Sequence, residues 1–393
     1  MLRPYTIGPS TTDTTAVLDE TRQRTAREYA RRRRRLWALG LALNGLLLFG
    51  LILAGAAGSL IRYVDLRADL PWWGRVAAVG IALGGLLYVS NLPLDFYAGF
   101  VLPHRVGLSN QTLSGWIGDA AKGGLMSAAI GLPMLVLVYG IIRIAGSAWW
   151  LWAGLATAGV TVVLATLAPI LFLPVFYRFR PLAEDRRPLA DQLARLAASA
   201  GVQVRGVYSF DLSRRTKAAN ALLVGAGPTR RILLGDTLLQ GFTPDEVETI
   251  LAHELGHHAH RDIPLGIAVQ SAIQMAHFFL AGMILQAGVP LLGLTGPADP
   301  GGLPLLALTI GLLGLVSLPL GNAYSRWRES MADSFALRLS GKPEAFASAM
   351  TRLANQNLAD ADPEPWVVWL LHSHPPLQER IARARGAAGV GAL

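Results

Sequence analysis

The chain contains no cysteine and unusually little charge. With no cysteine among its 393 residues, disulfide bonds, thiol nucleophiles and thiolate metal ligands are excluded, so any bound metal needs His, Asp or Glu. Charged residues make up only 16% of the chain, compared with about 25% in ordinary soluble domains. Hydrophobic residues make up 52%, and the mean hydropathy is +0.40. The sequence therefore lacks the polar surface that a soluble protein of this length needs.

Long apolar runs take the place of the missing charge. A helix needs about 20 apolar residues to cross the hydrocarbon core of a bilayer. Six runs reach this length, and the first is too long and too far along the chain to be a signal peptide. The sequence predicts a multi-pass membrane protein with about six spans. The runs are Leu36–Ile61, Val76–Leu102, Leu125–Ile144, Trp149–Val175, Pro264–Val289 and Leu303–Asn322.

Basic residues are distributed unevenly between the two sides of these runs. The 35 residues before the first run hold nine Arg and end in Arg31–Arg35. If that end is cytoplasmic, 31 of the 35 Lys and Arg are cytoplasmic, and the opposite side keeps four. Because cytoplasmic loops are enriched in Lys and Arg, both termini are predicted to lie in the cytoplasm, with the chain in the cell membrane. The charge of +9 thus indicates a lipid bilayer, and no nucleic-acid partner is expected without a basic groove carrying stacking aromatics.

The runs divide the chain into three parts. The leader is basic and cytoplasmic, and its segment Met1–Glu28 has little apolar periodicity and is expected to be partly disordered. An N-terminal membrane domain with four spans follows. The last part contains two further spans and enough polar sequence to fold outside the membrane. The predicted ranges are 1–35, 36–175 and 176–393, with the two late spans at 264–289 and 303–322.

The polar part of the last region combines strands and helices. VQVRGVYSF and ALLVG have the composition of strands, and TRRILLG follows ALLVG after a turn, which predicts a hairpin. Thr243 fits a helix N-cap, and Glu246 completes a capping box, so a helix is predicted from Pro244. Its continuation is expected to bend near Pro264. WVVWLL (Trp366–Leu371) is too short to span and is expected to lie against the membrane surface or the core.

The predicted helix from Pro244 carries a metal-binding pattern, HELGH. His253 and His257 are four residues apart, so both imidazoles project from one helix face and can reach one cation. Glu254 lies beside the first histidine and can accept a proton from a water molecule activated by zinc. The same residues could also be surface histidines at a polar helix end. His258 and His260 point away from this face and are not expected to be ligands.

A third ligand is available in the sequence RESMAD. Catalytic zinc needs a third protein ligand and an open position, and Glu329 can supply the ligand. Asp333 lies one helical turn further on and can hold the other ring nitrogen of a ligand histidine. RESMAD directly follows the sixth run and HELGH directly precedes the fifth, so both are expected at the same face of the membrane.

Five blocks of sequence resemble the type I CAAX prenyl proteases and their bacterial homologues, which are integral-membrane HExxH zinc metalloproteases. The blocks are LPLDFYAGFVLPHRVGLSNQT, NALLVG with RRILLGDTLL, HELGH, SRWRESMAD and SHPPLQERI. The resemblance implies a helical membrane bundle with a cytoplasmic α+β gluzincin-type domain built around the HExxH and ExxxD helices.

The resemblance also implies roles for individual residues. One zinc ion is expected on His253, His257 and Glu329, with Glu254 as the general base. His374 and Arg380 are expected at the active site, where His374 helps to stabilise the tetrahedral intermediate. The sequence by itself would leave His374 as a turn histidine before two prolines.

Substrate is expected to bind as an extended peptide along a sheet edge. The candidate edge is the strand at Asn220–Val224, with Asn220, Ala221 and Leu223 named as substrate-binding residues. Alternatively, this segment is a core strand, and Asn220 is a turn residue at its start. In the fifth run, Gln270, Gln274 and His277 form a polar stripe that fits either interhelical hydrogen bonds or a cavity wall, and the family's water-filled chamber favours the wall.

The sequence thus predicts a zinc metalloendopeptidase that cleaves peptide or protein substrates, including membrane-associated ones, near the cytoplasmic membrane face. A quality-control protease of the heat-shock membrane type is the alternative enzyme. A catalytically silent scaffold or lipid-binding helical bundle is the alternative of another class, although the intact set of four candidate residues in HELGH and RESMAD argues against it.

Overall fold

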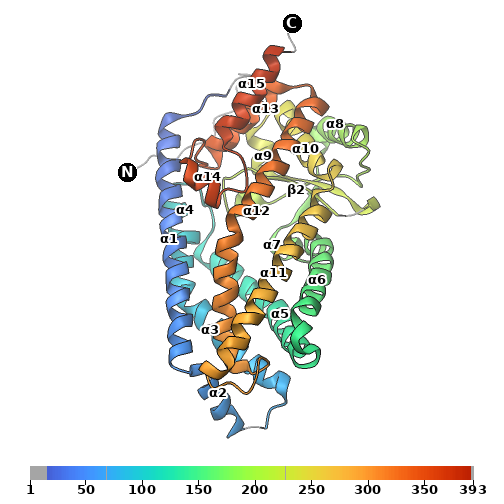
Figure 1. Cartoon of the computed structure of the whole chain (residues 1–393). Coiled ribbons are helices and arrows are strands. Elements are labelled where there is room, and N and C mark those ends of the chain that lie inside the picture. The colour runs from blue at the N-terminus through green and yellow to red at the C-terminus, as the bar shows by residue number, and fades with distance from the viewer. Residues whose placement is uncertain (1–15, 68, 226, 391–393) are drawn as a thin grey trace.

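Long helices form an elongated bundle, and a small domain of short helices and a sheet covers one of its ends (Figure 1). The computed structural model describes residues 16–67, 69–225 and 227–390. The helices are α1 (Glu20–Leu53), α2 (Ala56–Asp65), α3 (Trp72–Phe96), α4 (Leu102–Arg105), α5 (Leu113–Ala145), α6 (Trp149–Leu171), α7 (Leu173–Phe176), α8 (Arg187–Ser199), α9 (Asp236–Gly241), α10 (Pro244–Ala259), α11 (Asp262–Leu291), α12 (Leu303–Ser340), α13 (Pro343–Gln356), α14 (Pro365–Leu371) and α15 (Leu377–Val390). The strands are β1 (Phe179–Pro181), β2 (Val207–Phe210), β3 (Ala221–Val224) and β4 (Arg231–Gly235).

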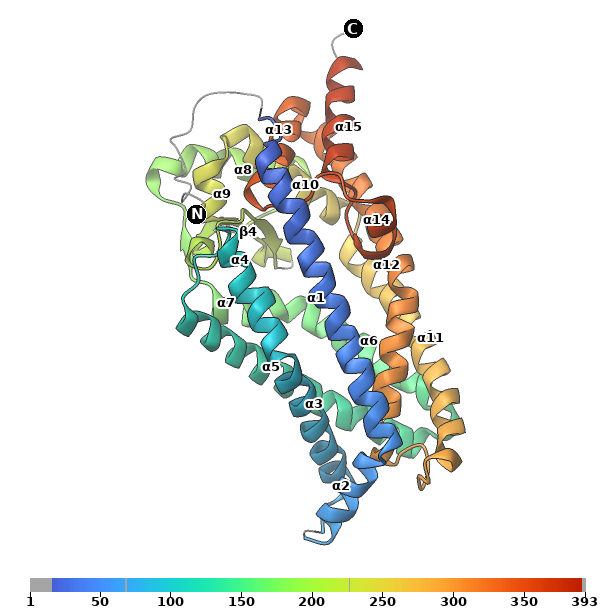
Figure 2. The same cartoon turned by 90° about the vertical axis from the view of Figure 1, so that its left-hand side faces the viewer.

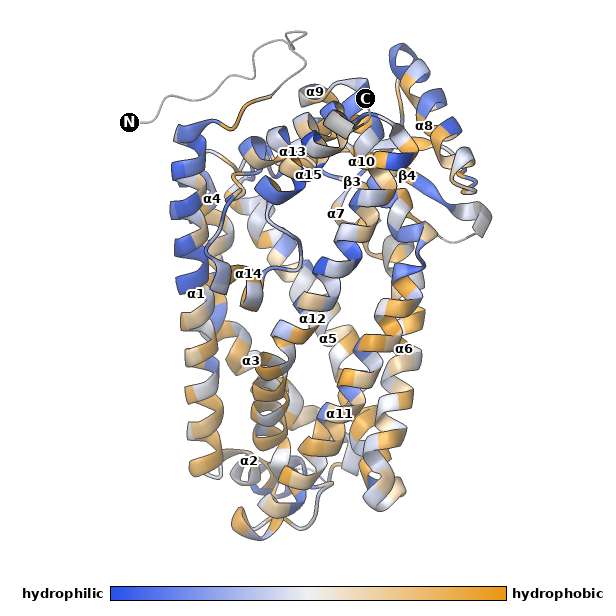
Figure 3. Cartoon of the chain, turned by 45° about the horizontal axis from the view of Figure 1, so that its top comes forward, coloured by the Kyte–Doolittle hydropathy of each residue, from blue (hydrophilic) through white to orange (hydrophobic). Residues whose placement is uncertain are grey.

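The apolar runs lie in the long helices. Five helical segments of the described chain are long and apolar enough to cross a membrane. One of them, 113–167, covers both α5 and α6, which turn at Gly146 with φ 55°. Figure 3 shows apolar residues along the lower lengths of α1, α3, α6 and α11, and hydrophilic residues in the domain above them. The number of bilayer crossings stays a prediction.

Helix α1 differs from its prediction at both ends. The expected disorder of Met1–Glu28 is wrong from Glu20 on, where Asp19 caps the helix by accepting a hydrogen bond from the Arg22 N–H. Gln23 and Ala26 are buried against the end of the chain because contacts far away in sequence order this segment. Residues 1–15 lie outside the described residues. The first predicted run also ends early, since α1 stops at Leu53 before Gly55, whose φ is 56°.

The sheet has four strands in the order β1-β2-β4-β3. Strands β2 and β4 are parallel, and the other neighbours are antiparallel. The predicted hairpin of β3 and β4 is confirmed, with Ala221 opposite Leu234 and Val224 opposite Arg231. Strand β3 therefore lies at an edge of the sheet. Strand β1 was not predicted, because only three residues pair there.

Helix α10 runs through the core of the small domain. The predicted capping box is confirmed: Thr243 accepts from the Glu246 N–H, and the Glu246 carboxylate accepts from the Thr243 N–H. Val247, Leu251 and Leu255 on α10 are at most 1% exposed and pack with residues of the sheet and of α8, α13 and α15. Fully burying a side chain of this size stabilises the fold by about 1.5–3 kcal/mol, so the core holds α10 rigidly.

The break between α10 and α11 comes earlier than predicted. It lies at His260 and Arg261, and Arg261 adopts the left-handed conformation with φ 54°. Pro264 instead falls in the first turn of α11, where a missing backbone N–H costs no hydrogen bond. This break turns the chain from the small domain into the bundle directly after the histidines.

Candidate metal centre and active site

Helices α10 and α12 approach each other closely beside the HELGH sequence. A side-chain Cβ at Gly256 would lie 2.9 Å from the Cα and 3.1 Å from the carbonyl oxygen of Ala332. Only glycine allows this backbone contact. The contact brings the histidines of α10 next to Glu329, which lies one turn before Ala332 on α12.

We expect Gly256→Ala to disturb the site although it adds a single methyl group. Because the neighbouring atoms are backbone, α12 must shift, at a cost of about 1–3 kcal/mol. The variant should show a lower melting temperature and less bound metal. Gly266→Ala on α11, which meets no atom within 4 Å, is the matched control and should behave as wild type. Wild-type metal content in the Gly256 variant would show that the close approach is dispensable.

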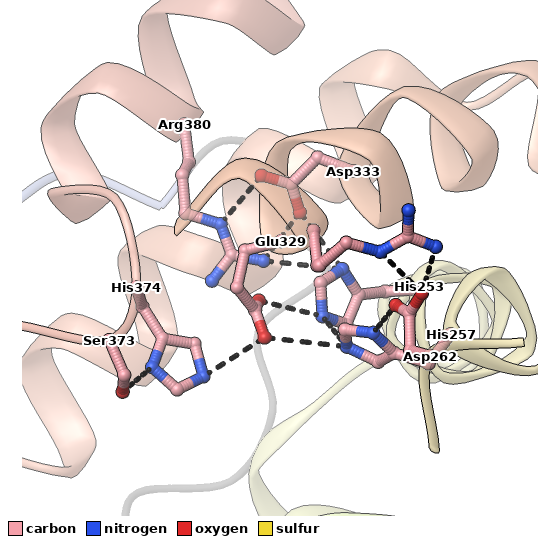
Figure 4. Close-up of polar contacts among 9 residues, drawn as sticks. His253, His257, Asp262, Glu329, Asp333, Ser373, His374 and Arg380 are labelled. Carbon is pink, nitrogen blue, oxygen red and sulfur yellow. Dashed lines mark hydrogen bonds and ion pairs between the residues drawn. The ribbon is translucent and has the colours of Figure 1, made fainter. Parts of the chain in front are cut away.

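Three metal-binding side chains meet between these helices (Figure 4). One ligand atom from each of His253, His257 and Glu329 lies within 4.8 Å of the others. The two Nε2 atoms are 3.1 Å apart, and Glu329 oxygens lie 3.2 Å from the His253 Nε2 and 3.4 Å from the His257 Nε2. The three residues that the sequence singled out as ligands are thus brought together by two helices.

Carboxylates on the far side of each imidazole orient the rings. Asp333 lies 2.9 Å from the Nδ1 of His253, as the sequence predicted for a ligand histidine. Asp262 lies 2.7 Å from the Nδ1 of His257. A carboxylate accepts the Nδ1 proton and leaves the Nε2 lone pair free for a metal. Both Nε2 lone pairs then face the third ligand, Glu329.

Two arginines hold these carboxylates in turn. Arg380 donates to Asp333 from Nε at 2.9 Å and from Nη2 at 2.5 Å. Arg328 donates to Asp262 from Nε at 2.6 Å, and also through Nη2. Asp262 and Arg328 were not predicted, because Asp262 follows the helix break and Arg328 comes from another helix. The signal that could have found Asp262 is the acidic residue that immediately follows HELGHHAHR.

The arrangement fits a cation. Two Nε2 lone pairs and a carboxylate converge, and the buried Oε2 of Glu329 has no neighbouring donor within the described chain except the His253 Nε2 at 3.2 Å. Such a group of acceptors repels itself unless a cation lies among them. In the bare chain a proton takes this place: burial lowers the pKa of His253, but hydrogen bonds to Asp333 and Glu329 outweigh it and raise the pKa to about 9. The donor set of two imidazoles and one carboxylate suits zinc and similar divalent metals.

Glu254 and His374 lie next to this group. Burial raises the pKa of Glu254, while the nearby His253 and His257 oppose the change. A carboxyl group with a raised pKa suits proton transfer. His374 is exposed, and its Nε2 lies 3.3 Å from Glu329 Oε1, while Ser373 Oγ lies 2.9 Å from its Nδ1 (Figure 4).

The short helix α14 places His374. The predicted element at Trp366–Leu371 is a single short helix, and α12 holds its end through two side chains. Asn322 donates to the carbonyl oxygen of Leu370 at 2.7 Å, and Arg326 donates to the carbonyl oxygens of Val368 and His372 at 2.8 and 2.6 Å. Both donors lie on α12, the helix that carries Glu329. Helix α12 therefore positions both Glu329 and the segment that leads to His374.

The named strand residues lie at the sheet edge. The Gly235 N–H donates to the Asn220 carbonyl oxygen at 2.9 Å, so Asn220 faces β4. Backbone direction alternates along a strand, and the N–H groups of both Ala221 and Leu223 therefore point away from β4. The described residues contain no further strand on that side.

A membrane helix supports the segment that leads into β3. Asp119 on α5 accepts from Nε and Nη2 of Arg215 at 2.7 and 2.8 Å. Beside this pair, Ser109 bridges to Thr216 in antiparallel fashion. The sequence did not reveal this contact, because 96 residues separate Asp119 from Arg215. The ion pair ties the membrane domain to the strand edge.

The two other histidines near HELGH do not join the metal-binding group. His260 packs its ring against Phe335 at 5.7 Å, and His258 is half-buried outside the group. On α11, the side chains of Gln270, Gln274 and His277 form no hydrogen bond with another described residue. These three residues therefore do not form the interhelical hydrogen bonds that one of the two interpretations expected.

Two family models match the chain along most of its length. The model of peptidase family M48 matches residues 183–388, and the model of the CAAX prenyl protease N-terminal region, described as five membrane helices, matches residues 9–178. The boundary between the two matches lies where the long helix α6 and the short helix α7 lead into the sheet.

Individual relatives and one solved structure agree with these matches. An uncharacterized metalloprotease, YhfN, of Bacillus subtilis is 27% identical over 97% of this chain and 89% of its own length. A CAAX prenyl protease 1 homolog of rice, Oryza sativa, is 32% identical over 76% of this chain and 70% of its own. The crystal structure of Ste24p from S. mikatae superposes with a TM-score of 0.83 at 23% identity, covering 97% of this chain and 92% of that one.

The structural likeness confirms the expected fold, a helical membrane bundle with a small α+β domain. The M48 match implies a metal cofactor, and the donor set between α10 and α12 fits one. Because that match spans more than half of the chain and the rice relative is 32% identical over 310 aligned residues, this chain belongs to peptidase family M48 and is an integral-membrane metalloendopeptidase related to the CAAX prenyl proteases.

Proposed function

We propose that the chain is a zinc endopeptidase that cleaves peptides at the cytoplasmic face of the cell membrane. The observation that supports this most directly is the convergence of two imidazoles and one carboxylate on one point between α10 and α12. His253, His257 and Glu329 hold the zinc ion, one per chain. When bound, zinc supplies Lewis-acid polarisation of the scissile carbonyl and lowers the pKa of water.

The other residues of the site move protons and fix geometry. Glu254 accepts the proton of the attacking water and later delivers it to the leaving amine. His374 donates a hydrogen bond to the oxyanion that develops on the substrate. Asp333 and Asp262 keep the imidazoles in the tautomer that leaves Nε2 free, and Arg380 holds Asp333 in place.

Peptide cleavage by purified protein tests this function. The wild type should cleave a fluorogenic peptide, lose this activity with a zinc chelator and regain it with added zinc. Activity that survives complete removal of the metal would contradict a metallopeptidase mechanism.

The outward edge of β3 is proposed to hold the substrate backbone. An extended peptide adds to a sheet edge through main-chain hydrogen bonds. Ala221 and Leu223 direct their N–H groups outward, and Asn220 begins the strand. The tie between Arg215 and Asp119 positions this edge beside α10.

We expect proline substitutions in β3 to separate substrate binding from sheet stability. Proline lacks an N–H donor, so Leu223→Pro should remove an outward hydrogen bond and strongly lower kcat/KM while metal content and melting temperature persist. Leu222→Pro should instead damage the sheet, because the Leu222 N–H faces β4. Leu223→Ala keeps the N–H and is the control for loss of the side chain. Wild-type cleavage by a folded Leu223→Pro variant would show that this edge does not bind substrate.

The backbone N–H groups of Ala221 and Leu223 both point away from β4. Residues two apart in a strand point the same way, so neither position tests the inner side of β3. Leu222 is therefore the matched inward position.

The substrate class is proposed from the relatives' names. Curated relatives carry the name CAAX prenyl protease 1 homolog, so a membrane-bound lipidated peptide is the first candidate. The unpartnered stripe of Gln270, Gln274 and His277 would line a wet cavity that such a peptide enters. Quality control of membrane proteins is the second candidate.

A trapping experiment distinguishes the two candidates. Glu254→Gln should bind substrate without cleaving it, so proteins that copurify with this variant, and not with wild type, are substrate candidates. Lipidated C-terminal peptides support the first candidate, and misfolded membrane proteins support the second.

Orientation can be tested directly because the chain has no cysteine. We expect Arg214→Cys to resist a membrane-impermeant thiol reagent in intact cells and to react after lysis. Leu291→Cys, at an exposed position on the other side, should react in intact cells. The asymmetry of basic residues is the physical reason. Labelling of Arg214→Cys in intact cells would reverse the orientation.

A further inference from the structure

A large cavity is lined by residues of α2 and its neighbours. Helix α2 lies at the end of the bundle opposite α10 (Figures 1 and 2). The volume of the cavity is about 1250 Å³, which exceeds the roughly 300–1,000 Å³ of ordinary small-molecule pockets. The turn between α1 and α2, the start of α3, the turn between α5 and α6, part of α11 and the loop 292–301 form its walls. None of the residues of the metal centre lines it, and the proposed peptidase activity does not use it.

The cavity lining is cationic in a part of the chain that is poor in cations. Among the described residues, only four Lys or Arg lie at this end of the bundle, namely Arg62, Arg67, Arg75 and Arg143, and all but Arg67 line the cavity. Arg62 comes from α2, Arg75 from α3 and Arg143 from α5, so three segments distant in sequence each contribute a guanidinium group to the cavity lining. Such a concentration indicates an anionic ligand.

The acidic residues of the cavity do not neutralise all of these cations. Asp65 pairs with Arg75 at 2.8 Å. Asp299 accepts hydrogen bonds from Thr295 and Gly301 and so stabilises the loop that contains it. Arg62 and Arg143 have no carboxylate partner within the described chain.

Their other contacts leave both cations able to bind an anion. Arg62 donates to the Ser59 hydroxyl at 2.9 Å, and the guanidinium of Arg143 lies 5.2 Å from the centre of a Trp72 ring. A guanidinium has five N–H donors. Each arginine can therefore bind phosphate oxygens as well.

The remaining walls are apolar and aromatic. Aliphatic side chains of α1, α3 and α5 line the cavity, together with three tryptophans; these residues are Leu51, Ile52, Val76, Ile142, Trp72, Trp149 and Trp150. Trp73 and Trp152 are exposed beside them. Tryptophans gather where a bilayer meets water, so the mouth of the cavity lies at the level of lipid headgroups. A free inorganic anion would gain nothing from apolar walls of this size.

We propose that this cavity binds one anionic phospholipid. Arg62 and Arg143 bind its phosphate, and the upper parts of its acyl chains lie along the apolar walls. The cations select the headgroup through charge-assisted hydrogen bonds, and burial of the chains adds affinity.

Native mass spectrometry of the purified full-length chain in neutral detergent tests the site. Phosphatidylglycerol and phosphatidylcholine with identical acyl chains are the probes, and inorganic phosphate is the competitor. Wild type should bind one phosphatidylglycerol in preference to phosphatidylcholine, and phosphate should not displace it. The double variant Arg62→Gln/Arg143→Gln should bind phosphatidylglycerol at least about tenfold more weakly, since it loses two charge-assisted contacts.

Arg67→Gln is the matched control. Arg67 lies at the same end of the bundle, stacks on Tyr63 at 5.2 Å and does not line the cavity. This variant should bind lipid as wild type does. Unchanged metal content and melting temperature in the absence of added lipid show that each variant is folded.

Three results would overturn the proposal. Equal phosphatidylglycerol binding by wild type and the double variant would exclude the two arginines. An equal loss in Arg67→Gln would reduce the effect to overall charge. Displacement by inorganic phosphate would identify a free anion as the ligand instead of a lipid.

Discussion

Glu254→Gln is expected to abolish peptide cleavage while the chain keeps its metal. The substitution preserves the size of the side chain but removes the group that accepts a proton. General-base catalysis by one positioned side chain contributes about 10²–10⁴-fold to a rate, so kcat should fall by roughly that factor. Metal content should stay at the wild-type level, because the proposed ligands are His253, His257 and Glu329.

The variant is compared with a second substitution on the same helix. Asp245→Asn changes an exposed carboxylate of α10 that pairs with Lys342 at 2.6 Å. It alters charge by the same amount and should keep wild-type kcat. A Glu254→Gln enzyme with more than a tenth of the wild-type kcat would exclude Glu254 as the general base.

Glu329→Ala is expected to release the metal. The substitution removes one of three protein ligands, and no other described carboxylate belongs to the group. Only the two histidine Nε2 atoms then remain to hold the cation, with no anionic ligand beside them. Elemental analysis after gel filtration should find one zinc per wild-type chain and almost none in the variant, with peptidase activity lost in parallel.

Two further variants compare the loss of metal with a smaller change and with a control. Asp262→Asn keeps all three ligands but removes the anionic acceptor at the His257 Nδ1, and a loss of about 10–100-fold in metal affinity is expected. Glu379→Ala changes an exposed carboxylate next to Arg380 and should have no effect. Full zinc occupancy in Glu329→Ala would refute the third ligand.

Local patterns predicted the elements that carry the site. The capping box at Thr243 and Glu246 sets the start of α10, because both hydrogen bonds form within four residues. The spacing of His253 and His257 places both on one helix face, since the helical repeat is local as well. The turn between ALLVG and TRRILLG likewise predicted the hairpin.

Other features depend on contacts between distant segments. The first turns of helix α1 are held in place by hydrogen bonds of Gln23 with Ala359 and Ala361, more than 300 residues away. Asp262 reaches His257 only because the backbone at Arg261 turns with φ 54°. Periodicity reports neither contact, since it records only which face of an element is apolar.

The sequence by itself therefore determined the chemistry: histidines and carboxylates without cysteine, on helices next to apolar runs, together with the HELGH spacing. Tertiary structure alone decided which carboxylate meets which histidine, how closely α12 passes Gly256, and which arginines gather in the cavity at the far end. The physical reason is range. Helix periodicity, capping and turns act over a few residues, whereas a metal centre and a cavity are built from side chains that only packing brings together.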